Sequence, residues 1–320
     1  MVMQDMATNT AESKIAITLD DLMRCEAMSV QFSLPPLVKS GSTLAGRHGS
    51  RFRGRGLNFE EFRSYQFGDD VRNIDWSVSL RTGELNVRVY SEEKDRSIYL
   101  IVDQRSTMFF ASVDTMKSVV VADIAAACAW RGIKNGDRVG AILLGDQSVE
   151  FYKPQRTRDQ VMRILGRMAE MNQALQGLIN RKPVESPYHL DDALLRLLQT
   201  QPKGALIVIL SDFRTVAPST NNYVQWLKRH NDILGVSVKD PMEVDLNVVD
   251  QLYMSDGELQ ATLTSEHRYA LHQYNQQSAD CAAHINRLIS ADGIPMVDLD
   301  TSGQHKLHFL QQMTGRVNVK

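Results

Sequence analysis

Hydrophobic residues form two almost continuous runs between residues 97 and 212. The segment SIYLIVD at 97–103 and the segment ALIVILSD at 205–212 are apolar nearly throughout, and each ends in an acid. Such runs are typical of parallel strands that are covered by helices on both faces. We therefore predict two central strands, with Asp103 and Asp212 at their carboxyl ends.

Longer stretches with helical spacing alternate with these runs and with other short β-rich runs. This alternation predicts crossover units and a mainly parallel sheet. The fold class expected for residues 96–320 is α/β, a three-layer sandwich of about six strands. Further strands are predicted at 138–144, 149–153, 233–238, 252–254 with 259–262, and 296–299, and helices at 115–131, 158–171, 190–199, 222–230, 265–289 and 304–313.

The chain before residue 96 has a different pattern. We predict a helix at 19–28, then a loop at Pro35 and Pro36, a segment rich in glycine and arginine, and a β-like run at 85–90. We assign residues 16–95 to an N-terminal extension, and we expect residues 1–15 to be disordered.

Net charge, cysteine spacing and the length of the apolar stretches argue against several classes of protein. The net charge of −2 gives no global reason to expect a nucleic-acid partner. Three widely spaced cysteines, Cys25, Cys128 and Cys281, lack the C-x-x-C spacing of a zinc site and are too few for a disulfide framework. The most apolar stretch, 119–130, is too short to span a bilayer and contains Asp123. We expect a cytoplasmic protein without a membrane span.

The two acids that end the central strands are the first candidate site. In open parallel sheets, ligands bind beyond the carboxyl ends of the strands, where the strand order switches. If their strands are neighbours, two carboxylates about 5.5 Å apart repel each other by roughly 3 kcal/mol at an effective dielectric near 20. A cation or a shared proton must therefore accompany Asp103 and Asp212.

This arrangement resembles the metal-ion-dependent adhesion site of von Willebrand factor A domains. That site combines a strand ending in D-x-S-x-S, a threonine from a second loop and an aspartate that ends a later strand. The matching residues here are Asp103, Thr107, Thr157 in PQRTRD, and Asp212. The resemblance implies a Mg²⁺ ion held by oxygen ligands, with Asp103, Thr107 and Asp212 as its candidate metal ligands, and an acid from a partner that completes its coordination.

One position departs from that pattern, because Arg105 stands where the middle serine is expected. Its guanidinium is permanently charged and matches a carboxylate in a forked geometry, so it can supply the positive charge and make a metal redundant. Two alternatives stay open. Ser106 can shift into the ligand position and retain Mg²⁺, or Arg105 can face solvent while Asp103 caps the following turn.

A second stretch, GRGLNFEEFRSYQFGDDVRNIDWSVSLRTGELNVRVY at 54–90, closely resembles the signature of the family called domain of unknown function 58, or DUF58. In that family the block precedes a von Willebrand A-like domain, and the resemblance covers roughly residues 46–240. Members are commonly encoded beside MoxR-type AAA+ ATPases. The signature residues are Arg55, Arg63, Tyr65, Gly68, Asp69, Asp70, Arg72, Asp75, Trp76, Arg81 and Arg88.

The signature block has two physical interpretations. Arginines and carboxylates in alternation suit an internal network of ion pairs that fastens the extension to the sandwich, with Trp76 and Tyr65 as apolar anchors. The segment Arg47–Arg55, in contrast, contains four arginines and no acid, which is typical of a surface that binds a partner or phosphates.

The sequence lacks a phosphate-binding G-x-x-x-x-G-K-[ST], a G-x-S-x-G elbow and an H-E-x-x-H helix. We therefore expect no enzymatic activity. The first hypothesis is an adaptor between a MoxR-type ATPase and a client protein, in which Asp103, Arg105, Ser106, Thr107, Thr157 and Asp212 form the docking surface. There, an acid of the partner binds either Mg²⁺ or the fork of Arg105. Two alternatives stay open: a protein that binds RNA or cleaves phosphodiesters through Arg47–Arg55, and a purely structural scaffold.

Overall fold

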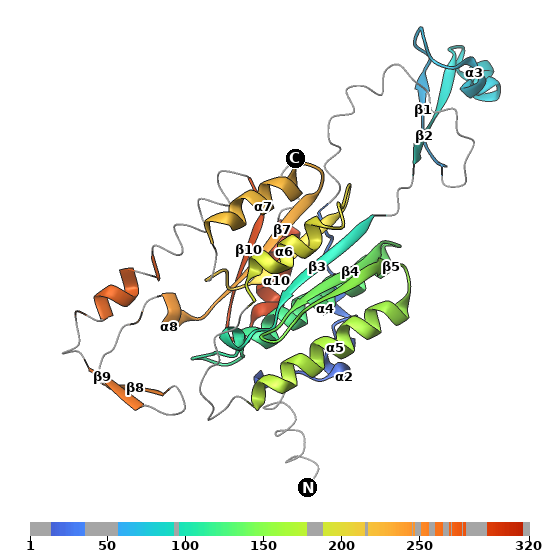
Figure 1. The fold of residues 1–320 in the computed structure, drawn as a ribbon. Helices are drawn as coiled ribbons and strands as arrows, with labels where there is room; N and C mark the ends of the chain where they lie inside the picture. Colours follow the sequence, from blue (N-terminus) through green and yellow to red (C-terminus); the bar gives the residue numbers. More distant parts are fainter. Residues whose placement is uncertain are drawn as a thin grey trace. The chain divides into compact units, whose positions relative to one another are not determined.

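The chain divides into two compact units, one of residues 1–37 with 96–320 and the other of residues 38–95. We call them the sandwich unit and the inserted unit. The residues predicted to be disordered, the segment Arg47–Arg55 and Cys281 lie wholly or mostly outside the described residues. The computed structural model describes residues 14–35, 57–92, 96–177, 188–214, 217–244, 246, 251–255, 260–264, 269, 271–276, 278–279 and 293–315 (Figure 1).

A six-stranded sheet with the order β10-β7-β6-β3-β4-β5 forms the centre of the sandwich unit. Each neighbouring pair is parallel except β4 and β5. The chain runs from β3 to β4 and β5, then returns to the other side of β3, so the strand order switches between β3 and β6. The strands are β3 (Ser97–Asp103), β4 (Arg138–Leu144), β5 (Val149–Gln155), β6 (Leu206–Ser211), β7 (Asp232–Lys239) and β10 (Met296–Asp300).

Helices cover both faces of this sheet (Figure 1). Leu100 and Val102 of β3 pack into a core that they share with α2, α4, α5 and α10. Tyr99 and Ile101 point to the opposite face and share a second core with α6 and α7. The predicted α/β fold with a mostly parallel central sheet flanked by helices is therefore confirmed, and it is compatible with the predicted three-layer sandwich. The helices are α2 (Leu19–Arg24), α4 (Lys117–Lys134), α5 (Arg158–Gln176), α6 (Leu190–Leu198), α7 (Pro218–Lys228), the short α8 (Pro241–Val244) and α10 (His305–Gly315).

The N-terminal segment, residues 14–35, packs on the sandwich unit, although we joined it to the extension from the sequence. Helix α2 begins with a capping box formed by Thr18 and Asp21. Leu22 of this helix is fully buried, and Trp130 Nε1 of α4 donates a hydrogen bond of 3.1 Å to its carbonyl oxygen. The amide of Ile17 donates to Asn172 Oδ1 of α5 at 3.0 Å.

The inserted unit contains an antiparallel pair, β1 (Leu57–Ser64) and β2 (Asn86–Glu92), and helix α3 (Trp76–Thr82). A register shift between Phe59 and Glu61 breaks the two-residue period of β1, which explains why the pattern did not predict this strand. Helix α3 begins at its N-cap Asp75 and ends at Gly83, whose φ of +80° suits a glycine.

The region between β7 and β10 contains two further strands. β8 (Gln251–Ser255) and β9 (Gln260–Thr264) pair with each other in a separate two-stranded sheet and do not join the central sheet. The helix predicted at 265–289 lies mostly outside the described residues. In the part of the chain that the structure describes, no helix is both long enough and apolar enough to cross a membrane.

The packing of the N-terminal segment gives a prediction for stability. We expect Leu22→Ala to lower the free energy of unfolding by about 2 to 5 kcal/mol, because it leaves a cavity between α2 and α4. Val30→Ala is the control, since Val30 belongs to the same segment but is 62% exposed, and it should cost less than about 0.5 kcal/mol. Urea unfolding of both variants measures the difference; equal losses would show that α2 is not part of the core.

Candidate functional site

The loops beyond the carboxyl ends of β3, β4 and β6 lie together at one end of the sheet. We call this region the rim and define it as residues 103–117, 145–148 and 211–214. Val102 pairs with Leu210, so Asp103 stands level with Ser211 on the neighbouring strand, and Asp212 follows directly. Because the strand order switches between β3 and β6, the rim lies where open α/β sheets place their ligands.

Asp103 is bound by the guanidinium of Arg105 through two hydrogen bonds. Nε of Arg105 donates to Oδ1 at 2.9 Å and Nη2 donates to Oδ2 at 2.7 Å. The hydroxyl of Ser211 donates to the same Oδ2 at 2.8 Å. Asp103 is fully buried and Arg105 is only 2% exposed. The pair is therefore a buried, forked ion pair, and Arg105 does not face solvent. Asp103 also caps the turn, because its Oδ1 accepts a hydrogen bond of 3.2 Å from the amide of Arg105.

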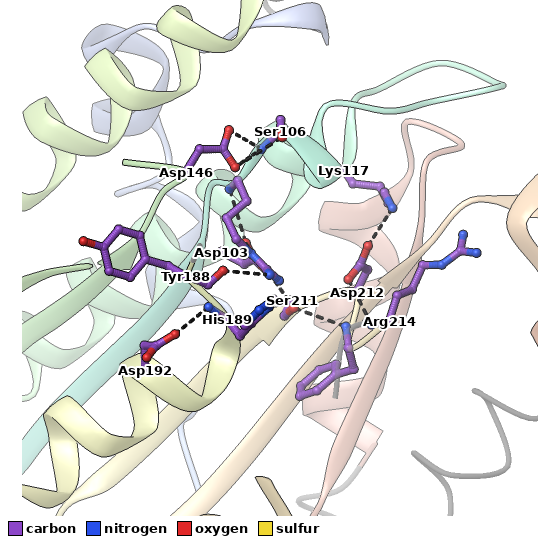
Figure 2. A network of polar contacts seen from close by, with 12 residues as sticks. Asp103, Ser106, Lys117, Asp146, Tyr188, His189, Asp192, Ser211, Asp212 and Arg214 are labelled. Carbon is purple, nitrogen blue, oxygen red and sulfur yellow. Dashed lines mark hydrogen bonds and ion pairs between the residues drawn. The ribbon is translucent and has the colours of Figure 1, made fainter. Parts of the chain in front are cut away.

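The environment of Arg105 explains how its charge persists in the interior. Burial alone lowers the pKa of this guanidinium, but the hydrogen bonds and charge of Asp103, followed by the charges of Asp212 and Asp146, raise it above its ordinary value. Nη1 donates a longer hydrogen bond of 3.4 Å to the carbonyl oxygen of Tyr188, which precedes α6 (Figure 2). The fork of Arg105 is thus already occupied within the chain.

Asp212 has a different cation. Nζ of Lys117, the first residue of α4, donates to Asp212 Oδ2 at 2.8 Å (Figure 2). The same ammonium donates to both carboxylate oxygens of Glu243 in α8, at 2.7 and 3.0 Å. Lys117 is fully buried. Burial alone lowers its pKa, but Asp212 and Glu243 outweigh burial and raise it.

The pleat of the sheet explains why one cation does not bind both acids. Side chains alternate between the two faces of a strand. Asp103 continues the series of Tyr99 and Ile101, which face α6 and α7, whereas Asp212 follows Leu210, which faces α4. Each acid therefore meets the cation on its own side of the sheet. Arg105 does not bridge the two acids; it binds Asp103 and acts on Asp212 only through its charge.

Ser106 binds a third acid at the rim. Its amide donates to Asp146 Oδ2 at 2.9 Å and its hydroxyl donates to Oδ1 at 3.2 Å. Asp146 follows β4, so it stands at the carboxyl end of the next strand. Burial raises the pKa of Asp146, and the hydrogen bonds from Ser106 oppose that effect only in part.

The two predicted threonine ligands lie in different parts of the sandwich unit. Thr107 is exposed on a short 3₁₀ helix, Ser106–Met108. Thr157 caps α5 at the opposite end of the sheet, because β5 runs antiparallel and Gln155 pairs with Val139 near the start of β4. Asp103 pairs with Leu144, and five residues of strand separate the two levels by roughly 16 Å. The candidate ligand Thr157 is thus distant from the rim.

The residues at the rim do not fit the Mg²⁺ ion that the resemblance implied. Both oxygens of Asp103 accept hydrogen bonds from Arg105, and one accepts a further bond from Ser211. Both oxygens of Asp212 also accept, one from Lys117 and one from the amide of Arg214. Each carboxylate already has a positive charge within hydrogen-bond distance, so a hard divalent cation would have to displace a buried side chain.

Four residues that hydrogen-bond to the predicted site residues or to one another were not themselves predicted from the sequence: Lys117, Asp146, Ser211 and Glu243. Lys117 carried a signal that was available. It is the first residue of a mostly apolar helix, at the end where the helix dipole disfavours a positive charge, so a lysine there indicates a nearby acid. Asp146 carried the same signal as Asp103, since it follows a predicted strand.

The signature residues of the inserted unit form two ion pairs within that unit. Arg63 Nη2 binds both oxygens of Asp69, at 2.9 and 3.0 Å. Arg88 Nε binds Asp75 Oδ2 at 2.7 Å, while Asp75 Oδ1 caps α3 by accepting from the amide of Val78. The hydrogen bond from the amide of Gln66, and after it the hydrogen bond and charge of Arg63, lower the pKa of Asp69 from its ordinary value. The hydrogen bond from the amide of Val78, and after it that of Arg88, lower the pKa of Asp75 in the same way.

The remaining signature residues have varied roles. Asp70 caps the 3₁₀ helix Val71–Asn73 by accepting from the amide of Arg72. Gly68 has a φ of +109°, which requires glycine. Tyr65 is half-buried, whereas Trp76 is 61% exposed on α3. Arg72 and Arg81 are exposed, and Arg55 lies outside the described residues.

The forked pair makes a first prediction for the rim. Arg105→Met leaves Asp103 buried without its cation, so the free energy of unfolding should fall by about 3 to 5 kcal/mol. The double variant Asp103→Asn/Arg105→Met removes both charges and should be more stable than the single variant. Urea unfolding measures both. Arg24→Met is the control, because Arg24 is 76% exposed in its pair with Asp21; a loss as small as that of the control would contradict a buried pair.

The poor fit to Mg²⁺ makes a second prediction. Arg105→Ser alone leaves Lys117 on Asp212, so removal of both cations in Arg105→Ser/Lys117→Ala is expected to be needed before the acids attract a divalent ion. Isothermal titration calorimetry should detect Mg²⁺ binding by the double variant and none by the unaltered chain. If the unaltered chain binds Mg²⁺ as tightly as the double variant, the two side-chain cations do not replace a metal.

Two solved structures resemble this chain weakly. A conserved hypothetical protein BatB from Bacteroides thetaiotaomicron aligns with 11% identity and a TM-score of 0.39, over 70% of this chain and 100% of the other. An aerotolerance-related membrane protein from Bacteroides fragilis aligns with 10% identity and a TM-score of 0.35, over 69% of this chain and 99% of the other. Likenesses at this level carry no argument about function.

Sequence relatives give a stronger result. The uncharacterized proteins Rv1480 of Mycobacterium tuberculosis (strain H37Rv) and Mb1516 of Mycobacterium bovis are each 27% identical to this chain over 271 residues, which is 82% of this chain and 80% of theirs. The model of the family described as protein of unknown function DUF58 matches residues 61–283. That match covers more than half of the chain and includes both the end of the signature block and the whole rim. The chain therefore belongs to the DUF58 family.

Proposed function

We propose that this chain is a non-enzymatic adaptor with a von Willebrand factor A-like sandwich, which docks other proteins through its rim. Its proposed partners are a MoxR-type AAA+ ATPase and a client protein whose maturation the two assist in a chaperone-like manner. This assignment rests on the DUF58 family and on what the resemblance implied for its members. Cys25 and Cys128 are free and buried thiols, which suits the proposed cytoplasmic location.

The observation that carries the proposal is the internal neutralisation of the rim acids. Asp103 and Asp212 are 0% and 3% exposed, and each is bound by a cation of the same chain. A general acid, a general base or a metal ligand has to reach a substrate or an ion. Acids that are buried and paired in this way suit a rigid docking end better than a catalytic centre.

The rim loops also offer exposed groups to a partner. Phe110 and Val113, in the loop that follows β3, are 40% and 58% exposed. Arg214, which follows β6, has a side chain that is 37% exposed and pairs with Glu243 at 2.8 Å. Exposed apolar side chains on one rim loop and a cation on another suit a protein partner that carries apolar and acidic side chains. The proposed contact is therefore made by these loops, since the fork of Arg105 is used by Asp103.

The alternative function, RNA binding or metal-dependent phosphodiester cleavage, needs acids that can hold a metal ion. Those acids are bound by Arg105 and Lys117. Arg47–Arg55, the proposed backbone clamp, lies outside the described residues. A filter-binding series over increasing salt separates the two functions, because a phosphate clamp loses affinity steeply as salt rises.

A pull-down with the MoxR-type ATPase of the same cell tests the proposed docking surface. Val113→Asp places a charge on the rim loop without touching the buried pairs, and it should weaken binding about tenfold, or roughly 1.4 kcal/mol. Val30→Asp is the matched control, since Val30 is 62% exposed on the N-terminal segment, away from the rim, and it should leave binding unchanged. Equal binding by the Val113→Asp variant and the unaltered chain would show that the rim does not dock the ATPase.

A further inference from the structure

Glu243 is an acid that the chain itself places on the cations of the rim. Its Oε1 lies 2.7 Å from Nζ of Lys117 and 2.8 Å from Nη1 of Arg214, and its Oε2 lies 3.0 Å from Lys117. The side chain of Glu243 is 14% exposed, whereas Lys117 is fully buried beneath it. Glu243 therefore lies between the buried Lys117 and Arg214, whose side chain is 37% exposed and which is the outermost of the four charged residues Asp212, Lys117, Glu243 and Arg214.

The two acids on Lys117 differ in how firmly the fold holds them. Asp212 directly follows β6, a strand whose residues are all buried. Glu243 lies in α8, which spans only Pro241–Val244 and has no buried residue. Beyond its ion pairs, the carboxylate of Glu243 accepts one long hydrogen bond of 3.4 Å from the amide of Asp240. The backbone of α8 is held by the carboxylate and carbonyl of Asp240, which accept from the amides of Met242 and Glu243, and by a hydrogen bond from Ser278 to the carbonyl oxygen of Glu243.

The surroundings of Glu243 fit a second carboxylate. Arg214 lies 6.0 Å from the ring centre of Tyr274, so its guanidinium has an aromatic face on one side and the carboxylate on another. Lys117 also has an aromatic neighbour, because its Nζ lies 5.9 Å from the ring centre of Phe110. If Glu243 withdraws, two cations flanked by aromatic rings become accessible, and that surface is suited to a carboxylate with an apolar stem.

We propose that Glu243 is an internal occupant of a carboxylate-binding site formed by Lys117 and Arg214, and that an aspartate or glutamate side chain of a partner protein replaces it on docking. This proposal rests on the proposed docking function of the rim and adds the chemical group that the rim would recognise. The exchange replaces one carboxylate by another on the same two cations, so neither cation is left buried without an acid in the docked state.

Because Glu243 occupies the site, it lowers the affinity of Lys117 and Arg214 for a carboxylate of another molecule. A carboxylate tethered to the chain competes at an effective concentration of at least about millimolar, so it weakens every external carboxylate by the same factor. A partner with further contacts on the rim loops overcomes this competition, whereas an isolated acid does not. The internal acid thus selects partners that bind both the site and its surroundings.

The test uses the full chain and two small probes, N-acetylglutamate α-amide and N-acetylglutamine α-amide, which differ only in the side-chain charge. Titrations followed by methyl NMR, with the methyl group of Met242 next to Glu243 as the reporter, measure their dissociation constants. In Glu243→Gln the glutamate probe should bind at least about tenfold more tightly than in the unaltered chain, and the glutamine probe should not gain.

Two further variants serve as a control and as a second test of the site. Glu150→Gln removes an acid that pairs with Arg167 at 2.7 Å on β5, and it should leave both titrations unchanged. Ser278→Ala loosens α8 and retains the carboxylate, so it should strengthen binding of the glutamate probe by a smaller factor. It also provides the readout if Glu243→Gln fails to fold.

Equal affinity of the glutamate probe for the unaltered chain, Glu243→Gln and Ser278→Ala would overturn the proposal, and so would equal gains for both probes. The titrations need no ATPase. Suppose that the glutamate probe gains affinity in Glu243→Gln but Val113→Asp does not change the pull-down: the carboxylate site is then retained and docking of the ATPase at the rim is refuted. If Val113→Asp weakens the pull-down but the probe gains no affinity, only the carboxylate site is refuted.

Discussion

The forked ion pair between Arg105 and Asp103 is the constraint on which the rim depends. A carboxylate that ends a central strand is removed from water by the helices and loops around it, and such a charge is tolerated only when a partner and hydrogen bonds compensate it. Arg105 supplies both, because its planar guanidinium meets both oxygens and carries a charge that does not titrate in the physiological range. The loop after β3 must return Arg105 to Asp103, and this requirement fixes how the loop leaves the sheet.

Asp212 needs a cation of its own, Lys117, because, of the two acids, Arg105 binds only Asp103. Because side chains alternate along a strand, Asp103 and Asp212 face opposite layers of helices, and a side chain from one layer meets only one of them. Lys117 begins α4 and reaches Asp212 from the other side. A divalent ion placed above the strand ends can contact both acids, whereas the two side-chain cations are divided between them: Arg105 neutralises Asp103 and Lys117 neutralises Asp212. The division leaves Lys117 with room for a second acid, and Glu243 takes that place.

Much of the fold could be predicted from the sequence, because continuous apolar runs mark buried parallel strands and the acids after them mark the carboxyl ends of those strands. The position of Thr157 was missed for a physical reason that the sequence also contained. Only residues 145–148 separate β4 from β5, which is too short for a parallel crossover and requires a hairpin. Strand β1 was missed because a bulge breaks its period. The packing of the N-terminal segment depends on contacts between residues far apart in sequence, which no local pattern encodes. The position of Lys117 at the start of α4 indicates a nearby acid, but no local pattern identifies Asp212, 95 residues further along the chain, as that acid.

A crystal structure of the full chain grown in Mn²⁺ tests most directly whether side-chain cations have replaced a metal at the rim. Anomalous scattering locates Mn²⁺ independently of any assumption about the ligands. The result we predict is the absence of an anomalous peak within coordination distance of Asp103 and Asp212, with Arg105 forked on the first acid and Lys117 bound to the second. A Mn²⁺ peak that joins both carboxylates, with the guanidinium of Arg105 turned into solvent, would contradict this account.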